Sequence, residues 1–263
     1  YGSMVEIIHG ARIMSANAAR KWILEPALSI GPQIYRILLE RIIENDLSPG
    51  DRVSESEIAI TYGVSRQPVR EAFIKLSDQG LLVVFPQRGT FISKINYVSV
   101  LDARFLREAI EADIVKILTE GTDRSLIKEL ENQIKAQNRC NENNAQEFIG
   151  LDELFHQTLA EAAGKSGTWI QIEGLKTQMD RVRYLSLSQV PVKNLVQQHA
   201  NIVASIKEKN IAKADFFIRT HLREVIQDLP QILEANPDFF ELPEGNIPVP
   251  VNAPMQKGED YEN

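Results

Sequence analysis

The stretch "YGVSRQPVREAF", residues 62–73, decides the fold expected for the first part of the chain. Gly63 stands where a helix-ending glycine is expected, and Ser65 is a residue type that caps helix starts. Arg66 and Arg70 follow one helical turn apart, so their side chains are expected on the same face of a new helix. Cations at a helix start oppose the helix dipole, which favours anions there. A purely structural helix gains nothing from this choice, and the pattern therefore predicts a surface that binds a polyanion.

The segments on either side complete a helix–helix–helix–hairpin order. Apolar residues recur with helical spacing over 31–45, a shorter helix is expected over 54–63, and two short apolar runs at 81–85 and 89–93 flank a turn. This order is typical of a winged helix-turn-helix, whose third helix enters the DNA major groove with its N-terminal residues nearest the bases. We expect DNA contacts from the start of that helix and from the hairpin tip, namely from Ser65, Arg66, Gln67, Arg70, Arg88 and Gly89.

The net charge of -7 argues against nucleic-acid binding only until it is divided along the chain. Residues 29–95 carry 8 Lys and Arg against 8 Asp and Glu, while residues 97–263 have a net charge of -8. The neutral first part is therefore able to present a local basic face to double-stranded DNA. The one cysteine, Cys140, rules out an internal disulfide and fits the reducing cytoplasm. No apolar run approaches the ~20 residues of a membrane helix, so no membrane partner is expected.

After residue 96 the chain has the apolar periodicity of successive helices. Helices are expected over 97–120, 123–140, 144–163, 168–188, 192–208 and 211–235, and the short breaks between them suit an antiparallel helical bundle. We therefore predict a mainly α protein, with an N-terminal winged helix-turn-helix (α with a small β-hairpin) followed by an all-α antiparallel helical bundle. The expected divisions are an N-terminal arm with a cloning remnant (1–28), the DNA-binding domain (29–96), the helical domain (97–235) and an irregular C-terminal tail (236–263).

Three of the four histidines fall on the apolar, inward faces of three different predicted helices. His156 follows Asp152 by one helical turn, so both side chains point to one side. His199 and His221 each have apolar residues three and four positions away. A single inward histidine is most often a core residue, but three with a carboxylate in one bundle are hard to explain as independent core residues. Bundle interiors are where facing helices build metal sites, and this ligand set suits a divalent metal, zinc above all, with nickel, manganese or iron possible.

No general base stands beside these ligands and no nucleophile motif occurs, so no enzymatic activity is expected. Two alternatives stay open at this point. In the first, the divalent metal is itself the signal, as in a metalloregulator. In the second, a metal-dependent hydrolase is fused to a DNA-binding module, because a catalytic zinc site keeps an open coordination position.

The run "LSPGDRVSESEIAITYGVSRQPVREAFIKLSDQGLLVVFPQRGTFIS", within residues 30–95, resembles the DNA-binding domain of GntR-type bacterial transcription regulators. The segments "LDELFHQTLAEAAG" and "QQHANIVASIKEKNIAKADFFIRTHLREVI" resemble the helical effector domain of the FadR branch of that family, called FCD, over about residues 97–232. The resemblance implies operator contacts by Arg66, Arg70 and Gly89. It also implies a metal site, because the family's Asp and three His match Asp152, His156, His199 and His221.

Arg107 matches an arginine of the first helix of the family's effector domain, and by this resemblance it would take a carboxylate of the effector in fork geometry. A salt bridge with Glu111, its i+4 neighbour, is the equally open alternative. Arg181 and Arg183 are weaker candidates for the same role. The resemblance as a whole implies a ligand-responsive transcriptional regulator, a repressor that works as a homodimer, in which a small organic acid effector binds at the metal and changes operator affinity.

Overall fold

A computed structural model of the chain describes residues 22–121, 123–141, 144–186 and 192–248. Contacts divide the chain into two compact units. The smaller unit comprises Tyr1–Glu40 and Val53–Thr90, and the larger unit comprises Arg41–Arg52 and Phe91–Asn263. The expected cloning remnant and most of the expected N-terminal arm lie outside the described residues. The end of that arm is held by Gln33, whose side-chain amide donates to the carbonyls of Glu25 and Leu28 at 3.1 Å each.

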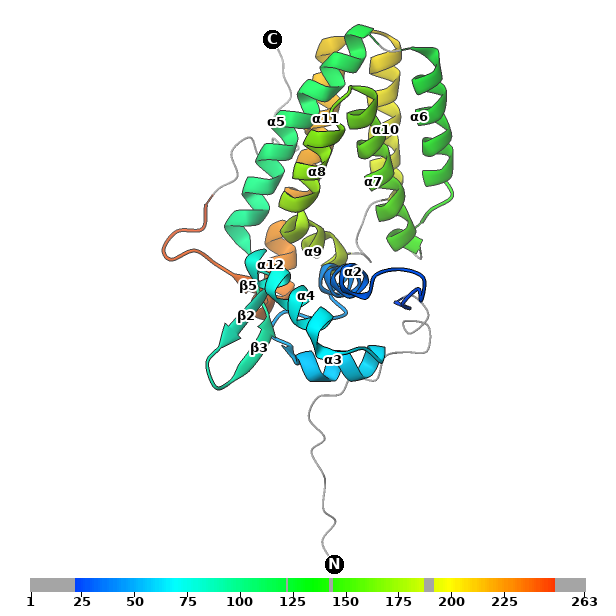
Figure 1. Ribbon diagram of the computed structural model, residues 1–263. Helices are drawn as coiled ribbons and strands as arrows, with labels where there is room; N and C mark the ends of the chain where they lie inside the picture. The colour runs from blue at the N-terminus through cyan, green and yellow to red at the C-terminus, as the bar shows by residue number, and fades with distance from the viewer. Residues whose placement is uncertain (1–21, 122, 142–143, 187–191, 249–263) are drawn as a thin grey trace, which may run out of the picture. The chain divides into compact units, whose positions relative to one another are not determined.

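The smaller unit and the segments that adjoin it in the chain have the expected helix–helix–helix–hairpin order (Figure 1). The elements are α2 (Ile30–Ile43), β1 (Arg52–Val53), α3 (Glu55–Tyr62), α4 (Arg66–Asp78), β2 (Leu82–Phe85) and β3 (Gly89–Ile92). The three strands form one sheet in the order β1-β3-β2, so the short strand that precedes α3 joins the hairpin. This confirms the winged helix-turn-helix.

The helix α4 packs as its sequence predicts. Gly63 ends α3 in the left-handed region, with a φ of 63°, where a residue without a Cβ is favoured. The next helix, α4, buries Val69, Phe73 and Leu76 against the core of the unit. Ser65 stands at the N-cap position of α4, but its hydroxyl makes no capping hydrogen bond, so that part of the expectation is wrong.

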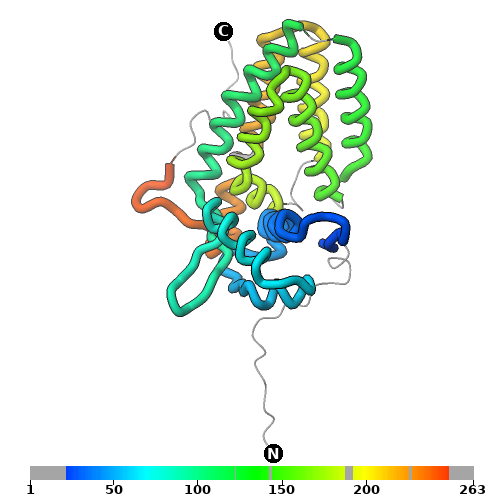
Figure 2. Tube along the Cα trace, viewed as in Figure 1, coloured from blue at the N-terminus to red at the C-terminus, as the bar shows by residue number. Residues whose placement is uncertain are grey.

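The larger unit is a helical bundle with one small sheet. Its elements are β4 (Ile95–Asn96), α5 (Tyr97–Gly121), α6 (Arg124–Gln137), α7 (Ala145–Ala162), α8 (Ser166–Leu175), α9 (Thr177–Leu185), α10 (Val192–Lys207), α11 (Ile211–Gln227), α12 (Leu229–Ala235) and β5 (Phe240–Glu241). The long helix α5 packs on α11, α11 on α10, and α10 on α6, as the chain trace in Figure 2 allows the reader to follow. Their apolar faces, with those of α7 and α8, form one core. Among the described residues, no helix combines the length and the apolar character that crossing a membrane requires.

Two segments expected as single helices are each divided. The segment expected over 168–188 forms α8 and α9, which separate at Lys176. No proline marks this break, so periodicity alone does not reveal it. The segment expected over 211–235 forms α11 and α12, because Pro230 at the start of α12 has no backbone N–H to continue the helical hydrogen bonds.

The start of the C-terminal tail is more regular than the sequence indicates. Phe240 and Glu241 form β5, which pairs in parallel with Ile95 and Asn96 of β4. Phe240 is only 3% exposed, because its ring packs into an apolar cluster with Ile95 and Leu229. The tail therefore contributes to the core where an irregular segment was expected. The end of the expected tail, residues 249–263, lies outside the described residues.

Arg181 on α9 joins three segments of the larger unit. Its fully buried guanidinium donates from Nη2 to the Ser93 carbonyl at 2.7 Å, and its own carbonyl accepts from Asn45 Nδ2 at 2.9 Å. Burial lowers the pKa of Arg181 to about 10, and no carboxylate among the described residues pairs with it. The helix α9 therefore contacts both stretches at which the chain passes to the smaller unit, Arg41–Arg52 and the stretch that begins at Phe91.

We expect the tail to stabilise the fold through its first residues only. Phe240→Ala should lower the free energy of unfolding by about 3 kcal/mol or more, because it removes a buried aromatic ring. Truncation after Leu242 should leave the melting temperature nearly unchanged, since residues 243–248 bury little apolar surface. Thermal and urea unfolding of the two variants measure both effects. An equal loss of stability in both variants would contradict this division of the tail.

Candidate functional site

The start of α4 carries four of the residues expected to contact DNA. Ser65, Arg66, Gln67 and Arg70 are all exposed there. The Arg66 side chain is 69% exposed and lies 3.6 Å from Glu55, and an exposed pair of this kind holds its partners only weakly. Both arginines are therefore available at the surface of the smaller unit.

The hairpin between β2 and β3 carries the other two residues expected to contact DNA, Arg88 and Gly89. Gln87 and Gly89 both have positive φ, 63° and 110°, which turns the chain tightly at the tip. The Arg88 guanidinium between them lies over the Phe85 ring, 5.6 Å from its centroid. The hairpin thus presents an exposed cation at its tip, as a DNA-contacting wing requires.

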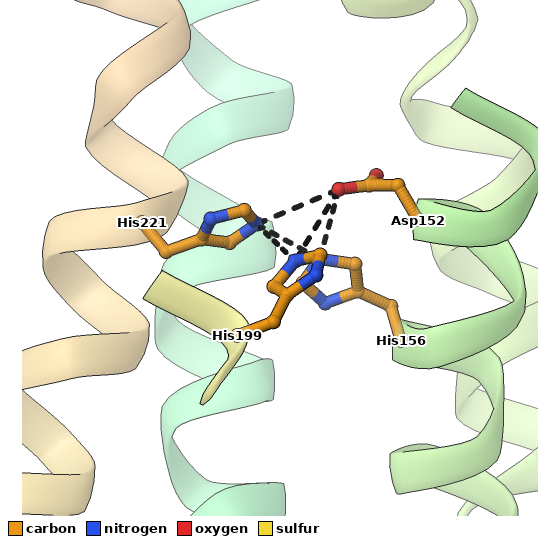
Figure 3. A group of neighbouring side chains, drawn as sticks. All are labelled: Asp152, His156, His199 and His221. Carbon is orange, nitrogen blue, oxygen red and sulfur yellow. Dashed lines mark hydrogen bonds and ion pairs between the residues drawn. The ribbon is translucent and has the colours of Figure 1, made fainter. Parts of the chain in front are cut away.

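A buried group of one aspartate and three histidines, here called the Asp–His cluster, lies inside the larger unit (Figure 3). Asp152 and His156 come from α7, His199 from α10 and His221 from α11. One ligand atom from each lies within 4.8 Å of all the others. The Nε2 of His221 is 3.1 Å from that of His156 and 3.2 Å from that of His199, and Asp152 Oδ1 is 3.4 Å from His199 Nε2.

Two glutamines fix which nitrogen of His199 and His221 carries the proton. Gln137 donates from Nε2 to a backbone carbonyl of α7 at 3.1 Å, so its Oε1, 2.8 Å from His199 Nδ1, must accept. Gln198 likewise donates to Glu224 at 3.3 Å and turns its Oε1 toward His221 Nδ1 at 2.9 Å. Each imidazole is therefore protonated at Nδ1 and directs the lone pair of Nε2 into the Asp–His cluster.

His156 is oriented by a carboxylate instead of an amide. Its Nδ1 lies 2.6 Å from Oε2 of Glu111 on α5. Burial by itself raises the pKa of Glu111, but the nearby Arg107 and His156 outweigh that effect and bring the pKa to about 2. An ionised carboxylate at this distance favours a proton on Nδ1, and in the neutral ring the lone pair of His156 is then on Nε2.

The Asp–His cluster has the donors and the spacing that a divalent metal needs. Three nitrogen lone pairs face Asp152 Oδ1, a buried atom with no hydrogen-bond partner among the described residues. Without a cation these acceptors repel one another and have lost their hydration. Nitrogen ligands about 2.0–2.1 Å from one ion lie roughly 2.9–3.4 Å apart, which agrees with the separations of 3.1 and 3.2 Å. The cluster is therefore a group that could hold a metal ion.

Arg183 on α9 balances the charge of this site. Its two terminal nitrogens donate to Asp152 at 2.7 Å and to Glu153 at 3.0 Å. Burial is the largest single influence on the pKa of Asp152 and raises it, but Arg183, His199 and His156 together outweigh burial and hold that pKa well below its usual range. Burial also lowers the pKa of His199 and holds that of His221 well below its usual range. The site thus combines an ionised carboxylate with two imidazoles, those of His199 and His221, that favour the neutral form, and these are the protonation states in which such groups bind metals.

A cavity of about 70 Å³ lies against the Asp–His cluster. The ionisable residues that line it are Arg107, Asp152, Arg183, His221, Glu224 and Asp228. Its apolar walls are Met179, Leu195, Leu222 and Ile232. Arg107 donates from Nε to Glu111 at 2.6 Å, while its buried Nη2 has no hydrogen-bond partner among the described residues. The salt bridge with Glu111, which was the alternative role for Arg107, is therefore formed, but it is buried and leaves Nη2 of this cavity-lining residue without a partner among the described residues.

Several residues of this site were missed or underrated by sequence reasoning. Arg183, expected to be a weaker candidate than Arg107, contacts Asp152 directly and lines the cavity, whereas Arg181 does not line it. Gln137 and Gln198 orient two imidazoles, yet periodicity does not distinguish them from any other polar residue. Gln198 does stand next to His199 in sequence, and this adjacency was the one local signal.

Comparisons with known proteins agree with this organisation. Residues 31–92 match the family described as bacterial regulatory proteins, gntR family, and residues 102–224 match the FCD domain. The HTH-type transcriptional repressor RspR of Escherichia coli (strain K12) is 36% identical over 219 residues, which are 82% of this chain and 96% of that protein. This chain belongs to the GntR family. An uncharacterized HTH-type regulator from an unstable DNA locus of Streptomyces ambofaciens is 37% identical to this GntR regulator over 217 residues, 82% of this chain and 92% of that protein.

Solved structures share the fold of this GntR regulator. E. coli McbR/YncC has a TM-score of 0.64 at 18% identity and covers 78% of this chain and 98% of its own. A putative GntR regulator from Rhodococcus sp. RHA1 has a TM-score of 0.62 at 22% identity and covers 79% of this chain and 99% of its own. The family and the relatives are transcriptional regulators, not enzymes, so this chain is a transcriptional regulator and the fused-hydrolase alternative is wrong.

We expect His199 and His221 in metal-free protein to carry their protons on Nδ1 at neutral pH, because Gln137 and Gln198 accept there. Long-range ¹H–¹⁵N correlation spectra of chelator-treated protein distinguish this tautomer. Gln137→Leu should mix the tautomers of His199 and leave His221 unchanged. Protonation of both rings at Nε2 in the wild-type protein would contradict the orientation derived above.

Proposed function

We propose that this GntR regulator is a repressor whose operator affinity is changed by a small carboxylic acid, bound beside a divalent metal in the FCD domain. The observation that carries the proposal is the cavity against the Asp–His cluster, whose lining includes Arg107, a residue with one guanidinium nitrogen, Nη2, that has no hydrogen-bond partner among the described residues. A planar guanidinium donor suits a carboxylate, the acceptor that it binds in fork geometry. The name of RspR as a repressor supports the sign of regulation.

The proposed DNA-bound form is a homodimer that acts in the cytoplasm. Two copies would place two α4 helices on the half-sites of a two-fold operator. Arg66 and Arg70 would read base edges, with guanine O6 and N7 as the preferred acceptors. Ser65 and Gln67 at the helix start would contact phosphates, while Arg88 and Gly89 would reach the backbone or minor groove from the hairpin.

Asp152, His156, His199 and His221 would hold the ion, and their donor set suits zinc first, with nickel, manganese or iron as alternatives. A bound divalent ion would supply a positive charge and an open coordination position beside the cavity. Gln137, Gln198 and Glu111 would keep the three imidazoles oriented by the contacts described above. Arg107 would take the effector carboxylate from the adjoining wall.

A metalloregulator that senses the ion itself is the second candidate. The cavity favours the organic effector, because a sensor of the ion alone needs no adjoining space lined by charged side chains. The two functions differ in one result. An effector acid should change operator affinity at constant metal occupancy, whereas for a metalloregulator only the metal should do so.

We expect Arg70→Ala to weaken specific operator binding by about 1–3 kcal/mol, because a base-reading arginine loses its bidentate contact. Fluorescence anisotropy titrations at fixed salt measure the change. Arg124→Ala is a matched control, since it removes an exposed arginine from α6 in the helical unit. Equal operator affinities for wild type, Arg70→Ala and Arg124→Ala would remove Arg70 from the interface.

Metal removal should lower the melting temperature of the protein, because an ion that binds only the folded state adds its binding free energy to stability. Basal operator binding should change little, since the DNA-contacting residues belong to the other unit, while the response to carboxylic acids should be lost. His199→Ala should imitate metal removal, and Asp152→Asn should weaken metal binding less because it keeps all three imidazoles.

Elemental analysis, thermal unfolding and operator titrations together test this prediction. Gln197→Ala is the matched control, because Gln197 lies on the exposed face of the helix that carries His199. Wild-type protein that retains no divalent ion at micromolar concentrations near neutral pH would show that the three histidines are core residues that share protons.

A further inference from the structure

We infer that Glu224 and Asp228 select the effector class: they accept hydrogen bonds from a hydroxyl or ammonium group at the far end of the cavity and reject a second carboxylate. The inference rests on the proposed function, because it concerns the same cavity. It defines the effector as a monocarboxylic acid whose distant end carries a hydrogen-bond donor.

The two acidic residues extend along the cavity away from the Asp–His cluster. Glu224 follows His221 by three residues on α11, so these two side chains share one side of that helix, while Asp228 stands at the N-cap of α12. At about 1.5 Å of rise per residue, Glu224 lies roughly 5 Å along the axis from His221, and Asp228 lies past the end of α11. All three line the same cavity. One end of the cavity is therefore the Asp–His cluster and the other is acidic.

Asp228 precedes the helix α12 but does not cap it with its side chain. It stands at the N-cap of α12, where a carboxylate commonly accepts from the first helical amides, but its side chain makes no capping hydrogen bond. No basic side chain among the described residues pairs with it, although it is half-buried. Burial raises the pKa of Asp228, as expected for a carboxylate that lacks a donor. A ligand hydroxyl or ammonium group would supply that donor.

Glu224 is only partly used within the protein. Its Oε2 accepts the long 3.3 Å hydrogen bond from Gln198, the amide that orients His221. No Lys or Arg among the described residues forms an ion pair with it. Glu224 therefore has acceptor capacity for a ligand, and its contact with Gln198 connects the acidic end of the cavity to the Asp–His cluster.

The opposite end has the complementary charge pattern. Arg107 and Arg183 line the cavity there, and the buried Nη2 of Arg107 has no partner among the described residues. This unpartnered N–H donor belongs to a guanidinium cation and therefore favours an anionic ligand group. It is an observation separate from the acidic pair. The cavity thus offers donors for a carboxylate near the cluster and acceptors for donors about 5 Å or more further on. Between the ends, Met179, Leu195, Leu222 and Ile232 would contact a carbon chain.

A second carboxylate at the far end would face Glu224 and Asp228 without a counter-ion. Like charges opposed in a partly buried site are strongly unfavourable, and this is a common means of excluding a wrong ligand. A methyl group there would leave two carboxylates without donors but would add no repulsion. The structure therefore predicts an order of affinity: donor-ended acids bind best, methyl-ended acids less well, and dicarboxylates least.

Four six-carbon acids that differ only at the far end test this order: 6-hydroxyhexanoate, 6-aminohexanoate, hexanoate and adipate. Each is titrated into the zinc-loaded full-length protein by calorimetry, with thermal shift as a second readout. The better of the hydroxyl and ammonium acids should bind about tenfold more tightly than hexanoate, and adipate should bind more weakly than hexanoate. The comparison of the first two acids identifies which donor the acidic end prefers.

Charge-neutral variants provide the matched test. Glu224→Gln/Asp228→Asn should abolish the preference for a donor-ended acid and raise the relative affinity for adipate by about tenfold. Glu234→Gln removes an exposed carboxylate from α12 outside the cavity lining and should leave the order unchanged. If the double variant does not fold, Asp228→Asn alone and the wild-type order still decide the question.

The outcomes separate this inference from the proposed function. Adipate or hexanoate binding at least as tightly as both donor-ended acids would overturn the selection by Glu224 and Asp228, while a carboxylate effector site would stand. Binding of none of the four acids at millimolar concentrations would overturn the effector site, and with it the selection. An unchanged order in the double variant would show that the two carboxylates do not select the ligand.

Discussion

The helical unit depends on three imidazole lone pairs and one carboxylate oxygen that face each other in a buried interior. Each histidine reaches this point from a helix that also contributes to the apolar core, and the ring of Phe155 stacks on His199 with centroids 4.2 Å apart. The groups that orient the rings come from further helices, Gln137 at the end of α6 and Glu111 on α5. Five helices therefore meet at one point, and a shift of any one of them would spoil hydrogen bonds or ligand directions.

Buried charge around this point is arranged as a chain of alternating sign. Asp152 pairs with Arg183, Arg183 with Glu153, Glu153 with Lys176, and Lys176 with Asp180. An isolated charge in this interior would be very costly, while paired charges with good geometry offset most of their desolvation. Removal of one member of such a pair commonly costs about 3–5 kcal/mol, because the partner stays buried without a counter-charge. The chain of pairs connects α9 to α7 and includes Lys176, the residue at which the helix expected over 168–188 divides.

The sequence predicted the parts of this protein that follow from local pattern. Helical periodicity, Gly63 and the two arginines of α4 were sufficient for the winged helix-turn-helix, and the inward faces of three helices were sufficient for the Asp–His cluster. Residues that act through long-range contacts were beyond such reasoning. Gln137 reaches His199 across 62 positions and Arg183 reaches Asp152 across 31, and neither separation leaves a trace in local spacing. The parallel pairing of β4 with β5 spans the whole helical unit and was missed for the same reason.

The two arginines of α9 have a mechanical consequence. Arg183 holds the ligand side of this short helix through Asp152, and Arg181, two residues away, holds the Ser93 carbonyl and presents its own carbonyl to Asn45. A nine-residue helix is too short to absorb a displacement by bending, so it moves as a lever. Through these contacts one short helix connects the surroundings of Asp152 with the two chain segments, around Asn45 and Ser93, that lead to the smaller unit. The uncompensated charge of Arg181 makes its burial costly, so among the described residues the hydrogen bonds with Ser93 and Asn45, and not a charge pair, connect α9 to these segments.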